Sequence, residues 1–157
     1  PVGKTPEIRI RRRREGLSII SSITNRGKVR FKVFEGAMKA PLLIDFMRRL
    51  VRESQKEGAP KVFLILDNLK VHHARQVQAW LQDNKEHIEV FYLPSYSPEL
   101  NPNELLNANL KAAITTQAPA RRKGQLKEAA IGHLRHLQKS PKKVQQFFGK
   151  DSVKYAA

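Results

Sequence analysis

The fold of this chain is set by one stretch, Val62-Phe63-Leu64-Ile65-Leu66-Asp67-Asn68, in which an apolar run leads directly into an acid. Apolar residues without alternation are typical of a strand covered on both faces of a parallel sheet. A carboxylate at the end of such a strand is costly unless a partner binds it. Because α/β sheets bind ligands at the carboxyl ends of parallel strands, Asp67 is the first candidate functional residue. The alternative is that Asp67 only caps the turn that follows.

The segments before this strand predict a β-hairpin and a helix. Residues 17–24 and 29–34 are rich in apolar and β-branched residues, and Asn25 and Gly27 between them favour a tight turn. Further upstream, Ile8 and Ile10 alternate with charged residues, which indicates a strand at the edge. A helix is expected over 41–56, where apolar residues recur at spacings of three and four.

The segments after it predict a parallel pair of strands and more helices. A second buried strand is expected at 88–93, and a helix at 73–84 connects it to the strand ending at Asp67 through a right-handed crossover. Further helices are predicted at 102–114, at 125–138 and from Pro141 onward. The fold class is therefore α/β, with antiparallel strands first and parallel strands later. The helices after Thr115 dock either on this core or on a partner subunit.

A large positive charge indicates a polyanionic partner. Of the 157 residues, 30 are Lys or Arg and 14 are Asp or Glu, for a formal net charge of +16. Such an excess points to nucleic acid. The densest run is Arg11-Arg12-Arg13-Arg14, which we expect to contact DNA phosphates, although such runs are more often only solvated. Cysteine is absent, which excludes disulfides and thiolate metal sites, and neither a signal peptide nor a membrane span is evident.

A second acid lies beyond a proline-rich loop. Residues 94–102 contain three prolines, which reduce the entropy lost on ordering, and lead to a helix for which Asn101 is the expected N-cap. Glu104 falls in the first turn of this helix, where the dipole favours an acid whatever its function. Glu99 competes for the same role. If the chain returns to the edge that holds Asp67, two carboxylates can bind a divalent metal there.

Four further residues are expected to support this pair. Asn68 and His72 follow Asp67 closely, Tyr96 lies in the proline-rich loop, and Asn101 precedes the helix. We expect Tyr96 to pack or to contact a nucleotide. No spacing of further ligands favours a zinc site at His72 and His73, so one of them is expected to position a neighbour or contact phosphate.

Three segments, 63–68, 92–102 and Glu104, strongly resemble the DDE transposases of bacterial insertion sequences in the mariner superfamily, and 17–27 and 153–157 are similar too. The resemblance implies a ribonuclease-H-like mixed sheet flanked by helices, and two Mg²⁺ or Mn²⁺ ions held by three acids. Asp67 matches the second acid and Glu104 the third. It further implies cutting and joining of DNA at element ends, a homodimer, and a cytoplasmic protein associated with the nucleoid.

The family's first acid lies on a central strand that precedes the segment matching Pro1–Pro6, and Glu7, Glu15 and Glu35 are poor substitutes for it. We therefore expect a fragment of a longer protein. Its residues 1–114 would form the catalytic core, incomplete at the N-terminus, and 115–157 a basic helical extension of the same domain. The alternatives are an inactive remnant that only binds DNA without sequence preference, and another ribonuclease-H-like nuclease, acting on Holliday junctions or RNA–DNA hybrids.

Overall fold

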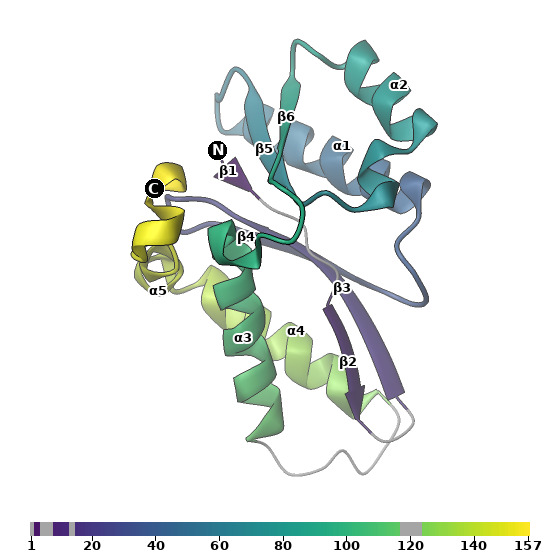
Figure 1. The fold of residues 1–157 in the computed structure, drawn as a ribbon. Helices are drawn as coiled ribbons and strands as arrows, with labels where there is room; N and C mark the ends of the chain where they lie inside the picture. The colour runs from purple at the N-terminus through teal and green to yellow at the C-terminus, as the bar shows by residue number, and fades with distance from the viewer. Residues whose placement is uncertain (1, 4–7, 13–14, 117–123) are drawn as a thin grey trace.

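The computed structural model describes residues 2–3, 8–12, 15–116 and 124–157, and side chains from Gly16 onward within these ranges. Two three-stranded sheets form its centre. The antiparallel sheet has the order β2 (Ile8–Arg12), β3 (Glu15–Ile23) and β4 (Val29–Phe34). The parallel sheet has the order β1 (Val2–Gly3), β5 (Val62–Leu66) and β6 (Ile88–Tyr92) (Figure 1).

The predicted hairpin is confirmed. β3 and β4 pair with Ile19 opposite Val33 and Ile23 opposite Val29, and the turn between them holds Gly27 at φ 86°. β2 pairs with β3 from Ile8 opposite Ile19 onward, which confirms the strand expected there. β5 and β6 are parallel, with Val62 opposite Ile88 and Leu66 opposite Tyr92, so both strands end at the same edge.

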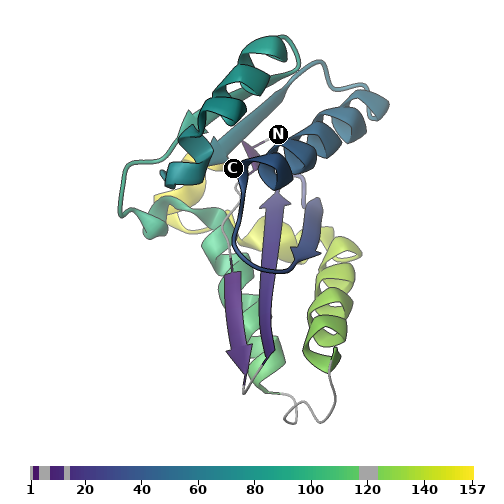
Figure 2. The same cartoon turned by 90° about the vertical axis from the view of Figure 1, so that its right-hand side faces the viewer.

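Two helices cover one face of the parallel sheet. They are α1 (Ala40–Lys56) and α2 (Arg75–Asp83), which lie beside β5 and β6 in the upper part of Figures 1 and 2. Phe46 and Met47 of α1 and Val77 of α2 share a buried core with Leu64 and Leu66 of β5. Full burial of each such side chain contributes roughly 1.5–3 kcal/mol. The expected helix at 73–84 begins later, at Arg75, because Lys70–His73 form a short 3-10 helix, η1.

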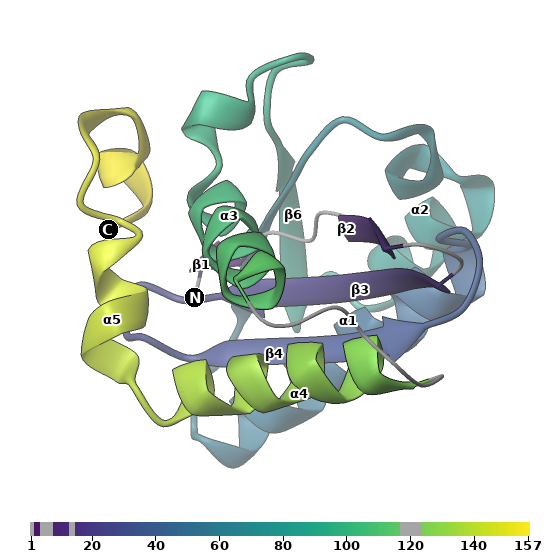
Figure 3. The same ribbon diagram turned by 90° about the horizontal axis from the view of Figure 1, so that it is seen from below.

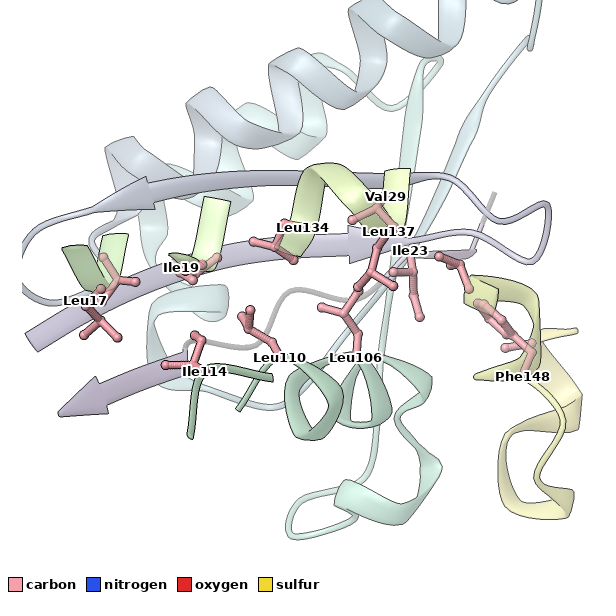
Figure 4. Close-up of a cluster of buried hydrophobic side chains, with 14 residues drawn as sticks. Leu17, Ile19, Ile23, Val29, Leu106, Leu110, Ile114, Leu134, Leu137 and Phe148 are labelled. Atoms are coloured by element: carbon pink, nitrogen blue, oxygen red, sulfur yellow. The ribbon is translucent and has the colours of Figure 1, made fainter. Parts of the chain in front are cut away.

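Three helices cover the hairpin instead. α3 (Pro102–Thr115) and α4 (Gln125–Gln138) pack on β3 and β4, followed by α5 (Pro141–Gln146) and the 3-10 helix η3 (Asp151–Ala156) (Figure 3). In Figure 4, side chains of the strands face those of the helices across a second core; the labelled residues include Ile19, Ile23, Leu106, Leu110, Leu134 and Leu137. The helices after Thr115 therefore dock on the core of their own chain.

The prediction that β5 and β6 are buried on both faces is wrong. Phe63 is 42% exposed and Phe91 is 47% exposed, and their ring centroids lie 6.4 Å apart. Helices α1 and α2 cover one face of the parallel sheet, whereas α3, α4 and α5 pack on β3 and β4. The apolar sequence of β5 does not show that its second face stays open. Among the described residues, every helix is too short or too polar to span a bilayer.

Candidate active site at the carboxyl edge of the parallel strands

Asp67 follows β5 directly, at the edge where both long parallel strands end. The backbone N–H of Leu93 donates to the carbonyl of Leu66 at 2.8 Å, which extends the pairing of the two strands to their last residues. The segments that follow, one beginning at Asp67 and one at Pro94, therefore leave the sheet side by side. The Asp67 side chain is 27% exposed, so its carboxylate is partly open to solvent and partly enclosed.

His72 contacts Asp67 from the protein interior. Its side chain is fully buried, and Nδ1 donates to the Asp67 carbonyl oxygen at 2.8 Å. The same Nδ1 lies 3.0 Å from Asp67 Oδ1, but this second contact lacks hydrogen-bond geometry, and Oδ1 remains a buried acceptor without a hydrogen-bond partner. A buried, unpaired carboxylate oxygen costs free energy unless a cation binds it. Asp67 therefore fits a divalent metal, which prefers oxygen ligands.

A network of side chains fixes the turn between β5 and α2. Asn68 donates through Nδ2 to Ser95 Oγ at 2.8 Å and also bonds with His73 Nε2. The His73 ring stacks on Tyr92 with centroids 4.3 Å apart, and the Tyr92 hydroxyl donates to the His72 carbonyl at 3.0 Å. These contacts join the segment after β5 to the end of β6 and to the segment that follows it.

Glu104 is positioned by the cap of α3. Asn101 is the N-cap, and its Oδ1 accepts from the Asn103 backbone N–H at 3.0 Å. Its Nδ2 donates to Glu104 Oε1 at 3.1 Å, so one buried amide both starts the helix and orients the acid. Asn103, which is fully buried, donates to Ser21 Oγ on β3 at 3.1 Å. This bond docks the first turn of α3 onto the antiparallel sheet.

Comparison with known proteins assigns the chain to a family. Residues 1–127 match the family model described as DDE superfamily endonuclease. The chain belongs to this family. A 74-residue stretch is 36% identical to the insertion element IS630 uncharacterized 39 kDa protein of Shigella sonnei, covering 47% of this chain and 21% of that protein. The match thus spans about a fifth of that relative's length.

Solved structures confirm the ribonuclease-H-like fold class of this DDE-family chain. The catalytic domain of Mos1 mariner transposase superposes with a TM-score of 0.71 at 19% identity, over 99% of this chain and 81% of that one. The Mos1 paired end complex with Mn gives 0.68 at 17% identity, over 99% and 56%. A simian T-cell lymphotropic virus intasome gives 0.60 at 14% identity, over 82% and 46%.

The structure places the predicted site residues of this DDE-family chain in two groups. Asn68 and His72 gather around Asp67, and Asn101 contacts Glu104. Within the described ranges, no three His, Asp or Glu side chains lie close enough to hold an ion together. The competing acid, Glu99, is exposed on the 3-10 helix η2 (Pro98–Leu100).

The predicted arginine run lies largely outside what the structure describes. Arg11 and Arg12 belong to β2, where their backbones pair with Gly16 and Glu15. Arg13 and Arg14 lie outside the described residues. Contact of this run with DNA therefore stays a prediction.

Sequence reasoning missed Ser95 and the pair Asn103–Ser21. Asn103 carried a signal, because it precedes Leu106 and Leu110 by three and seven positions and so lies on their face of the helix. A polar residue on an apolar helix face is a sign of a specific buried partner. Ser21 shows the same pattern on β3, between Ile19 and Ile23.

A hollow lies at the other end of β5. It has a volume of about 480 Å³, and its lining includes Lys28, Arg30, Ser54, Glu57 and residues 62–64. Arg30 and Lys28 form ion pairs with Glu57 there. This hollow adjoins the start of the strand, whereas Asp67 lies beyond its end, so the hollow is separate from the carboxylate site.

Proposed function

We propose that this chain is the catalytic core portion of an insertion-sequence transposase that cuts and joins DNA strands with divalent metal ions. The observation that carries the proposal is the partly exposed carboxylate of Asp67 at the carboxyl edge of β5, whose buried Oδ1 has no hydrogen-bond partner. Family membership supports the reaction class, and the net charge of +16 supports a DNA substrate. We assign Asp67 and Glu104 to two of the three acids that the family pattern uses.

Each site residue has a distinct task in this proposal. The Asp67 and Glu104 carboxylates are the metal ligands. His72 fixes the Asp67 backbone through its carbonyl, and Asn101 orients Glu104 from the cap of α3. Bound metal would supply Lewis-acid chemistry, activating water or a 3′ hydroxyl and stabilising the leaving oxygen. Because both acids are held by buried partners, little reorganisation is needed when the substrate arrives.

The same proposal extends to cofactors and partners. We assign two Mg²⁺ or Mn²⁺ ions, DNA element ends and target DNA as substrates, and a homodimer as the working form, located with the nucleoid in the cytoplasm. The support is that similar Mos1 structures include paired end complexes with Mn and with Mg. Arg11–Arg14 are assigned to phosphate contacts.

The test is cleavage by the intact transposase that contains this chain, with Asp67→Asn and Glu104→Gln. Both variants should lose DNA cleavage by at least 100-fold while binding the same DNA, because a carboxamide is a poor ligand for Mg²⁺. Titration calorimetry with Mn²⁺ should show weaker binding in both. Glu99→Gln is the matched control and should cleave like wild type. Full cleavage by Asp67→Asn would refute the site, and loss in Glu99→Gln with activity in Glu104→Gln would move the second ligand to Glu99.

A further inference from the structure

Tyr96 has the most unusual backbone and side chain of the proline-rich loop. Its side chain is fully exposed, with a relative exposure of 101%. Its φ is 58°, and in the described part of the chain it is the one non-glycine residue with a positive φ. The left-handed region is disfavoured for a bulky residue and easier for glycine or asparagine. The loop therefore places a tyrosine where a smaller residue would suit the backbone better, although the ring packs on no described neighbour.

The loop that carries Tyr96 is fixed at both ends. On one side, Ser95 accepts the hydrogen bond from Asn68, next to Asp67. On the other, the N–H of Leu100 donates to the Ser97 carbonyl at 3.2 Å, and the Tyr155 hydroxyl donates to the Leu100 carbonyl. Tyr96 therefore lies in a loop that is held on both sides, and in the sequence this loop falls between Asp67 and Glu104. An exposed ring on a fixed support loses little entropy on binding.

We propose that Tyr96 is a stacking platform for an unpaired DNA base next to the phosphate bound at Asp67 and Glu104. Both faces of the ring are free, and stacking on an aromatic ring is open to any base. Bases inside a duplex are already stacked, so the ligand is a base at a strand end or one flipped out of the helix. The net charge of +16 favours DNA over an apolar protein surface as the partner. The inference rests on the function proposed above.

The experiment compares two DNA duplexes bound by the intact protein, with Ca²⁺ in place of Mg²⁺. One duplex ends in a short single-stranded overhang that carries 2-aminopurine, and the other is blunt. Tyr96→Asn removes the ring but suits the backbone, so it should melt at or above the wild-type temperature. It should bind the overhang duplex roughly 5- to 100-fold more weakly, bind the blunt duplex within about two-fold of wild type, and lose the quenching of 2-aminopurine.

Two variants serve as controls. Tyr96→Phe keeps the ring and should retain affinity and quenching. Phe91→Asn removes another exposed aromatic ring, on the open face of the parallel sheet, and should change neither.

Three results would overturn the inference. If Tyr96→Asn binds both duplexes like wild type, the stacking role is wrong and the proposed function stands. If Tyr96→Asn binds DNA normally but lowers self-association in sedimentation, Tyr96 is a protein contact. If the wild type binds neither duplex, the proposed function fails and the stacking role fails with it.

Discussion

Asn103 shows how much one buried amide contributes to the site. Its Nδ2 donates to Ser21 Oγ, while its Oδ1 has no hydrogen-bond partner. Because it precedes Glu104, any shift of Asn103 moves the acid. The hydrogen bond joins residues 82 positions apart, so it ties the start of α3 to the C-terminal half of β3.

We expect Ser21→Ala to destabilise the protein by about 1–3 kcal/mol, because it leaves a second polar atom of Asn103 buried without a partner. Asn103→Leu should cost a similar amount by leaving the Ser21 hydroxyl unpaired. The double variant should be more stable than the sum of the two predicts, since both polar partners are then gone. Urea unfolding of the four proteins measures this, and strictly additive free energies would contradict the pairing.

Glu53 gives the protein a specific acid sensitivity. Burial of its carboxyl raises the pKa, but hydrogen bonds from Arg49 and Arg30 outweigh this and hold the pKa below its ordinary value of 4.5. A lowered folded-state pKa means that the unfolded chain binds the proton more readily. The stabilisation is therefore present above pH 4.5 and is lost as the pH falls through the folded-state pKa.

We accordingly expect Glu53→Gln to be less stable than wild type at pH 7, with a difference that shrinks as the pH falls below 4.5. Urea unfolding at pH 7, 5 and roughly 3.5 gives the two curves. Exposed Glu99 provides the control, because Glu99→Gln should follow wild type at neutral pH. A difference between Glu53→Gln and wild type that stays constant with pH would contradict the assignment.

At the scale of elements, the β3–β4 turn serves as the support for α5. Gly27 has a φ of 86°, and a Cβ added there would lie 2.4 Å from the carbonyl oxygen of Pro141, the first residue of α5. Gln138 at the end of α4 donates to the Val29 carbonyl at 2.9 Å, beside the same turn. The hairpin turn and the α4–α5 junction are therefore in direct backbone contact.

We expect Gly27→Ala to destabilise the protein by more than about 2 kcal/mol, because it combines an unfavourable φ with a backbone clash. Gly36→Ala is the matched control. Gly36 also has a positive φ, 78°, but nothing lies within 4 Å of an added Cβ, so only the backbone cost of about 1 kcal/mol applies. Thermal unfolding of the two variants separates the cost of the backbone conformation from the cost of the clash. Equal losses of stability would show that α5 moves away from the added methyl group.

For the whole molecule, the predicted partner is a polyanion because the net charge is +16. If Arg11–Arg14 neutralise phosphates, replacing all four with Ala should reduce the slope of log affinity against log salt by up to about 3–4, at roughly 0.9 per phosphate. Replacing four exposed lysines elsewhere, Lys139, Lys142, Lys143 and Lys150, removes the same charge and should change the slope less. If the slope of log affinity against log salt is the same for the two variants, the arginine run contributes only through the overall charge and makes no specific phosphate contacts.

The sequence by itself determined the elements and the ends of several of them. The hairpin, the cap of α3 at Asn101 and the position of Asp67 after β5 were all predicted, because turn glycines, caps and apolar periods act within a few residues. The sequence also indicated the family, because the motifs around Asp67 and Glu104 are short continuous segments.

Tertiary structure alone decided which faces and atoms are covered. The open face at Phe63 and Phe91, the unpaired Oδ1 of Asp67 and the bond from Asn103 to Ser21 depend on where distant segments pack. An apolar run shows that a strand can be buried, but the helices that cover it come from elsewhere in the chain. The docking of α4 and α5 on the hairpin was also decided by tertiary structure. Its core combines residues from both ends of the sequence.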